Sequence, residues 1–201
     1  MKFLYFLLAF VPFTGFAQAE KDSLLLANYE SVKEKLELMQ YLDQKANGLY
    51  KQDAAAMAKI DKDFAGFYRD SVLAGNPTRL DISAYLGYKP GKQPKSLERF
   101  QEEAFSANLD MLLSLTKTYG YLCGQRINKL KPDGKLISGL ICTQRIKGYE
   151  KRLRKLFDTE YKIGNMPEGE YVFFDTMANC NGVLTNADIE RMDKAGMKMF
   201  K

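Results

Sequence analysis

Apolar side chains recur every three or four residues between positions 22 and 73, which is the period of one face of a helix. They share one heptad register: Leu25, Tyr29, Val32, Leu36, Met39, Ala46, Tyr50, Met57, Ile60, Phe64 and Phe67. Asn47-Gly48 has the residues of a helix end, and Asp53 before three alanines has those of a new helix start. The run predicts one long helix or a hairpin of two, and its unbroken register favours the long helix. Such stripes usually pack within their own chain, so we expect a core face rather than a partner-binding coiled coil.

Proline and glycine interrupt this pattern between residues 75 and 95. The segment is too rich in aromatic and aliphatic residues for a free linker, so we expect an ordered connector. Ser96 can cap a following helix, whose wide apolar face runs from Leu97 to Leu115. Lys131-Pro132-Asp133-Gly134 has the residues of a turn. The helical period then returns, so we expect a second helix over 135–157 that folds back on the first.

The pattern changes again after Tyr161. Residues 170–174 read as a short strand or an extended core segment, and residues 187–194 as a helix. Thr185 can cap that helix, with Asp188 placed for a capping box. The sequence therefore predicts a mainly α protein. Its predicted parts are an N-terminal helical segment (20–74), a connector (75–95) and a compact C-terminal helical domain (96–201).

The first nineteen residues have the order of a secretory signal. Lys2 precedes an apolar run from Phe3 to Phe13, and the triplet Ala17-Gln18-Ala19 provides a cleavage site. The run is shorter than the roughly 20 apolar residues that span a bilayer. We therefore expect cleavage before Glu20, no transmembrane segment afterwards, and a periplasmic or secreted bacterial protein.

Composition removes several kinds of chemistry. The chain has no histidine, which excludes a Ser-His-Asp triad, a Cys-His pair and a histidine-ligated metal. It has no tryptophan, the best side chain for stacking on sugars. The formal net charge of +5 is mild, so it requires no nucleic-acid partner. The sequence indicates no cofactor.

Two of the three cysteines lie symmetrically about the turn at Pro132-Asp133. Cys123 and Cys142 would face each other in any antiparallel hairpin folded there, and nearby glycines would let the two arms approach closely. An exported protein meets an oxidising environment. We therefore predict a Cys123–Cys142 disulfide that staples the hairpin, with the alternative that both are buried thiols. Cys180 remains as a buried thiol or an intermolecular partner.

Residues 179–188 resemble one calcium loop of the EF-hand or dockerin type. Asn179, Asn181, Thr185 and Asp188 fall at ligand positions, and Gly182 at the position of the sharp turn. The first position, normally Asp, is Met177, so only one carboxylate remains. A polar turn leading into a capped helix explains the same residues, and we expect no calcium binding.

Basic residues gather between positions 126 and 155, where ten lysines and arginines accompany two acids. Lys147, Lys151 and Arg154 share one helical face. Such a face either is simply solvated or meets an anionic envelope polymer, lipid head groups or an acidic protein surface.

In general plan, the chain looks like the helical periplasmic accessory proteins of bacterial secretion and conjugation machines. That resemblance implies a non-enzymatic adaptor or scaffold in an envelope assembly, with protein partners in the cell envelope. The alternatives are a basic enzyme acting on the cell wall and a small calcium-dependent binding module. Adjacent acids such as Glu102 and Glu103 point about 100° apart on a helix, so they cannot flank one glycosidic bond.

Overall fold

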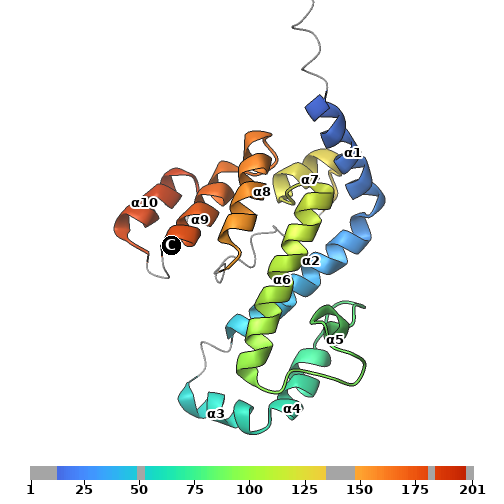
Figure 1. Ribbon diagram of the computed structural model, residues 1–201, viewed down its shortest axis with the longest axis vertical. Coiled ribbons are helices and arrows are strands. Elements are labelled where there is room, and N and C mark those ends of the chain that lie inside the picture. The colour runs from blue at the N-terminus through green and yellow to red at the C-terminus, as the bar shows by residue number, and fades with distance from the viewer. Residues whose placement is uncertain (1–12, 49–52, 135–147, 181–183, 198–201) are drawn as a thin grey trace, which may run out of the picture.

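The computed structural model describes residues 13–48, 53–134, 148–180 and 184–197, together with side chains from Gln18 onward. Helices form all the regular structure within these ranges, which confirms the mainly α prediction (Figure 1). The elements are α1 (Phe13–Ala27), α2 (Tyr29–Gly48), α3 (Ala54–Lys62), α4 (Phe64–Phe67), the π-helical turn η2 (Tyr68–Leu73), α5 (Ile82–Tyr85), α6 (Leu97–Tyr119), α7 (Gly124–Leu130), α8 (Glu150–Lys162), α9 (Glu168–Asn179) and α10 (Asn186–Lys194).

The N-terminal stripe is divided among several helices. Helices α1 and α2 are separated only at Asn28, whose side-chain Nδ2 donates to the carbonyl of Leu24 at 2.9 Å. Helix α2 ends at Gly48, and the side chain of Asp53 caps α3 by accepting from the amide of Ala56. The structure therefore does not contain the favoured long helix. The stop signal at Asn47-Gly48 and the start signal at Asp53 coincide with the end of α2 and the beginning of α3.

The stripe is a core face. Helix α2 crosses α6 along much of its length and packs closely against it (Figure 1). Leu25, Val32, Leu36 and Met39 are fully or almost fully buried, among leucines from the C-terminal half of α6. The surface that a coiled-coil partner would need is occupied inside the chain.

Two apolar clusters share these two helices. One joins α1, the first half of α2 and the second half of α6 to α7, α8 and α9. The other joins the second half of α2 and the first half of α6 to α4, η2 and α5. In the second cluster Tyr68 and Phe100 meet edge to face, with ring centroids 5.8 Å apart. Residues 20–74, 75–95 and 96–201 all contribute to the core.

Several predicted boundaries agree with the structure. The hydroxyl of Ser96 accepts from the amide of Arg99 and caps α6. The connector contains α5, capped by Asp81, and buries Ile82 in the core. Thr185 and Asp188 form both hydrogen bonds of a capping box at the start of α10.

The extended segment predicted at 170–174 is wrong, because these residues belong to helix α9. The spacing of the inward-facing residues is helical: Phe174 lies in the core, while Tyr171 and Ala178, three residues before it and four after it, pack against the core as partly buried residues. Two consecutive phenylalanines and a valine mimic a strand over five residues, and only the longer window shows the helical period. Of the helix predicted over 135–157, the structure describes residues 148–157, and helix α8 begins there at Glu150.

Cys123 is a free, buried thiol, and no disulfide occurs among the described cysteines. Its Sγ donates to the carbonyl oxygen of Asn165 at 3.4 Å. The structure shows no disulfide at Cys123, and Cys142, its predicted partner, lies outside the described residues. Hairpin symmetry about Pro132-Asp133 predicts that Cys123 faces a residue of the opposite arm. Instead the chain turns at Gly120, and Cys123 points toward the α8–α9 turn.

None of the helices that can be described has both the length and the apolar character needed to cross a membrane.

Candidate binding surface

Helix α8 is anchored by its apolar face. Leu153 and Phe157 are fully buried, and the ring of Phe157 meets those of Tyr121 and Phe174 edge to face, with centroids 5.3 and 4.7 Å away. These contacts fix which side of α8 faces outward. The charge pattern of α8 then decides what the outward side presents.

The acidic side chain at the end of α8 is turned inward. Glu160 is 1% exposed, and one carboxylate oxygen accepts from the amide of Tyr121 at 2.8 Å and from Nδ2 of Asn165 at 2.7 Å. Its other oxygen lies 3.3 Å from Nζ of Lys21 on α1. A buried carboxylate with an opposite charge and two donors is well compensated. Glu160 therefore adds no negative charge to the surface.

The other two acids of α8 also have partners within the protein. Asp158 is half-buried and accepts a 2.7 Å hydrogen bond from the hydroxyl of Tyr171. That hydrogen bond, together with burial, raises the pKa of Tyr171 to about 12. Glu150 accepts from the amide of Gly148 at 2.7 Å. The carboxylates of α8 are thus held by the fold.

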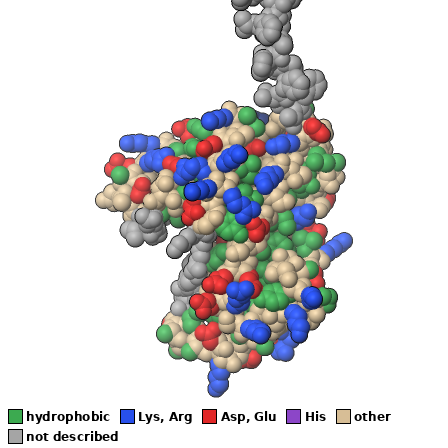
Figure 2. All heavy atoms as spheres, in the orientation of Figure 1, with side chains coloured by type: hydrophobic (Ala, Val, Ile, Leu, Met, Phe, Trp, Pro, Cys, Tyr) green, Lys and Arg blue, Asp and Glu red, His purple; other side chains and the backbone are tan. Residues whose placement is uncertain are grey.

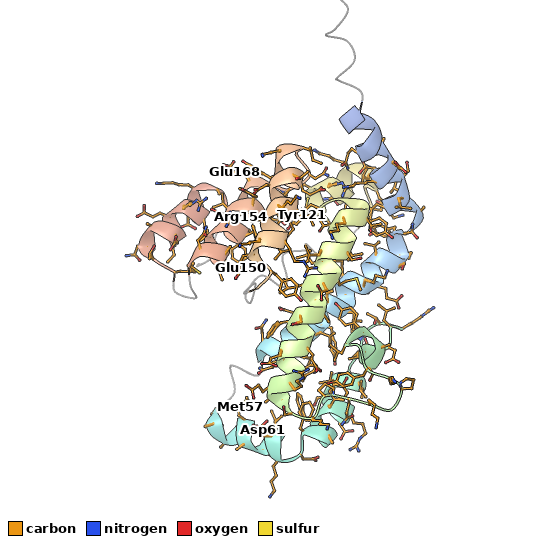
Figure 3. All side chains as sticks on the ribbon, in the orientation of Figure 1. Met57, Asp61, Tyr121, Glu150, Arg154 and Glu168 are labelled. Atoms are coloured by element: carbon orange, nitrogen blue, oxygen red, sulfur yellow. The ribbon has the colours of Figure 1, made fainter. Side chains whose placement is uncertain are left out.

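An arginine of α8 is also engaged within the protein, which changes the predicted basic face. Arg154 extends from α8, where Figure 3 labels it. It pairs with Asp175 on α9 and lies over the ring of Phe174. Arg191 of α10 reaches the same carboxylate at 2.7 Å. Burial alone would raise the pKa of Asp175, but the hydrogen bonds from both guanidinium groups hold it below its ordinary value. Arg154 therefore acts as a link between helices rather than as a free surface cation.

Three exposed lysines remain on the outward side of α8. They are Lys151, Lys155 and Lys162, which we call the lysine row. At 100° and 1.5 Å per residue they lie within about 40° around the helix and span roughly 16 Å along it. The ion pairs that α8 forms with other described residues involve Arg152, Arg154 and Glu160, and none involves the row. Figure 2 shows lysine and arginine side chains gathered over this part of the molecule.

Of the predicted basic face, Lys151 is exposed, while Lys147 lies outside the described residues. It missed Lys155 and Lys162 as members of one row. The signal was available, because Lys155 follows Lys151 by four residues and Lys162 follows it by eleven, or about three turns. What the sequence did not reveal was which charges the fold neutralises.

Two exposed apolar side chains lie at the end of the row. Tyr161 is 38% exposed and Ile163 is 46% exposed, and all four residues of 161–164 are exposed. The ring of Tyr161 stacks on that of Tyr171, with centroids 4.3 Å apart and planes 6° from parallel. The stacking holds Tyr161 in place beside Lys162.

A polar cluster lies beneath this end of α8. Nη1 of Arg126 donates to the carbonyl of Tyr121 at 2.9 Å, and its Nη2 lies 2.5 Å from a carboxylate oxygen of Asp22. Asn165 also donates to the side chain of Gln18 at 2.9 Å. A small cavity of about 150 Å³ opens beside Gln18, Asp22, Cys123 and Arg126. The cluster joins α1 to α7 and to the α8–α9 turn.

The described residues that resemble a calcium loop form helix caps and hydrogen bonds within the protein. Thr185 and Asp188 form the capping box of α10, and Nδ2 of Asn179 donates to the backbone carbonyl of Asp175 at 2.8 Å. The side-chain oxygen of Asn179 faces the guanidinium of Arg154. Asn181 lies outside the described residues. Within the described ranges, no three His, Cys, Asp or Glu side chains converge as a metal site.

The acids considered for an enzyme are engaged as well. Glu103 accepts from the guanidinium of Arg99 at 2.6 Å and from the hydroxyl of Tyr88 at 2.6 Å.

Comparison with known proteins gives no relative: no family model, curated protein or solved structure matches this chain.

Proposed function

We propose that this protein is a non-enzymatic, exported helical adaptor of a bacterial envelope assembly, and that the lysine row of α8 is its contact surface. The observation that carries the proposal is the arrangement of charge on α8. Glu160 is buried and paired with Lys21, and Asp158 is half-buried beneath the hydroxyl of Tyr171. Lys151, Lys155 and Lys162 are exposed and form no ion pair with another described residue. A row of exposed cations on a rigidly anchored helix suits an anionic partner surface.

The proposed export agrees with the contacts of α1. Cleavage before Glu20 would remove Gln18 but retain Lys21 and Asp22, the residues that pair with Glu160 and Arg126. The mature chain would therefore keep the ion pairs that attach α1 to the rest of the protein. Intact-mass analysis of the exported protein tests this part, and loss of nineteen residues is the expected result.

The contact surface is tested by charge reversal. The variant K151E/K155E/K162E should lose its retention in washed envelope fractions while staying exported and helical. The variant K59E/K62E/K92E changes three exposed lysines elsewhere by the same total charge, and it should be retained like the unaltered protein. Equal retention of both variants would contradict the proposed contact surface.

A further inference from the structure

We infer that the lysine row and the adjoining tip, residues 161–164, bind the surface of an anionic lipid bilayer. This inference rests on the proposed function and names the partner of the same surface. It begins with the lysines, because exposed cations near a membrane are attracted to anionic head groups over about a Debye length. The row offers three such cations on one side of one helix.

The exposed apolar residues of the tip favour a lipid surface over other anionic partners. Ile163 exposes 46% of its surface at the end of α8, and Tyr161 exposes 38% beside Lys162. Tyrosine is enriched where membrane meets water, and an exposed aliphatic residue gains by entering the head-group boundary. An acidic polymer would contact the lysines but would gain nothing from Ile163.

The geometry suits shallow docking without insertion of a helix. Stacking on Tyr171 holds Tyr161, and the buried pair of Leu153 and Phe157 holds α8 itself. The row and the tip therefore meet a surface together without a conformational change. Of the α8 carboxylates, Glu160 is buried against Lys21, and Asp158 is half-buried against Tyr171, so neither is fully exposed to an approaching lipid surface.

The test is co-sedimentation of the full chain with vesicles. We expect binding to vesicles that contain about one third phosphatidylglycerol, weak binding to phosphatidylcholine alone, and loss of binding as salt is raised. K151E/K155E/K162E should weaken binding at least about tenfold, while K59E/K62E/K92E should change it less than about twofold.

The variant I163S distinguishes lipid from other polyanions. It should weaken binding to the anionic vesicles several-fold and leave binding to soluble polyglutamate unchanged. Circular dichroism should show that each variant remains helical, which controls for loss of folding. No binding of the unaltered protein to the anionic vesicles, equal loss in both triple variants, or no effect of I163S would overturn the inference. Row-dependent retention in envelope fractions without vesicle binding would overturn only the lipid assignment and leave the proposed function standing.

Discussion

Lys21 and Glu160 lie 139 positions apart in the chain, and the ammonium of one meets the buried carboxylate of the other at 3.3 Å. The contact ties the first described helix to the end of α8. It also removes the one fully buried acid of α8 from the surface charge. Both the attachment of α1 and the character of the lysine row therefore depend on Glu160.

The surroundings of Glu160 predict a ladder of stabilities. Glu160→Leu should lower the free energy of unfolding by about 3–5 kcal/mol, because Tyr121 and Asn165 would lose a buried acceptor. Glu160→Gln retains an acceptor and should cost roughly 1–2 kcal/mol. Lys21→Ala should cost less than about 1 kcal/mol, because Lys21 remains partly exposed. Urea unfolding measures all three, and a larger loss for Lys21→Ala than for Glu160→Leu would contradict this order.

Gly120 permits the turn that brings these groups together. Its φ is +76°, and a Cβ there would meet Arg126, Asn165 and Glu160 at 3.0–3.1 Å. Gly87 has a similar φ of +82° with open space around it. Gly87→Ala should cost about 1–2 kcal/mol from backbone conformation alone, and Gly120→Ala should cost more because of the added crowding. Equal losses of unfolding free energy for the two variants in thermal or urea unfolding would contradict this prediction, because they would show that Arg126, Asn165 and Glu160 can move to accommodate the added Cβ.

Asp43 predicts a pH-dependent stability. Burial raises its pKa from 3.8 to about 6, so the folded state holds the proton more tightly than the unfolded state does. The stability gained from this tighter proton binding is fully present below pH 3.8, and it is lost as the pH rises through about 6. Asp43→Asn should therefore be more stable than the unaltered protein at pH 7.5, by up to about 3 kcal/mol, with little advantage at pH 3.5. Unfolding at both pH values tests the sign, and an advantage that grows toward low pH would contradict it.

Cys123 should resist modification in the folded protein. The thiol is 1% exposed, and burial raises its pKa, so little reactive thiolate forms near neutral pH. Alkylation followed by mass spectrometry should label Cys180 before Cys123, with Cys123 reacting only on unfolding. Non-reducing peptide mapping is the counterpart measurement. A Cys123–Cys142 crosslinked peptide would show that the bridge expected from hairpin symmetry forms after all.

Local signals in the sequence located much of the fold. Ser96, Asp53 and Thr185 each cap a helix where their side chains and neighbours predicted one, because capping depends on residues three positions away. The three- and four-residue spacing of apolar side chains in the N-terminal stripe is also a local signal, and it predicts a core face. The starts of α3, α6 and α10 could thus be predicted before their packing was known.

Long-range pairing could not be read in the same way. Nothing near Arg154 in the sequence shows that Asp175 neutralises it, and nothing near Glu160 points to Lys21. The predicted face of Lys147, Lys151 and Arg154 therefore included an arginine that links helices and omitted Lys155 and Lys162. The prediction of an extended segment at 170–174 was wrong for a related reason. The hydrophobic period of five residues fits a strand or a helix until the packing of Phe174 is known.

The most direct test of the lysine row as a contact surface is site-specific photo-crosslinking in living cells. A photoreactive residue at position 155 should crosslink to an envelope component, whether protein or lipid. The same residue at position 59, an exposed lysine on α3, should give no such product. No crosslink from position 155, or the same product from both positions, would contradict the proposal that α8 carries the binding surface.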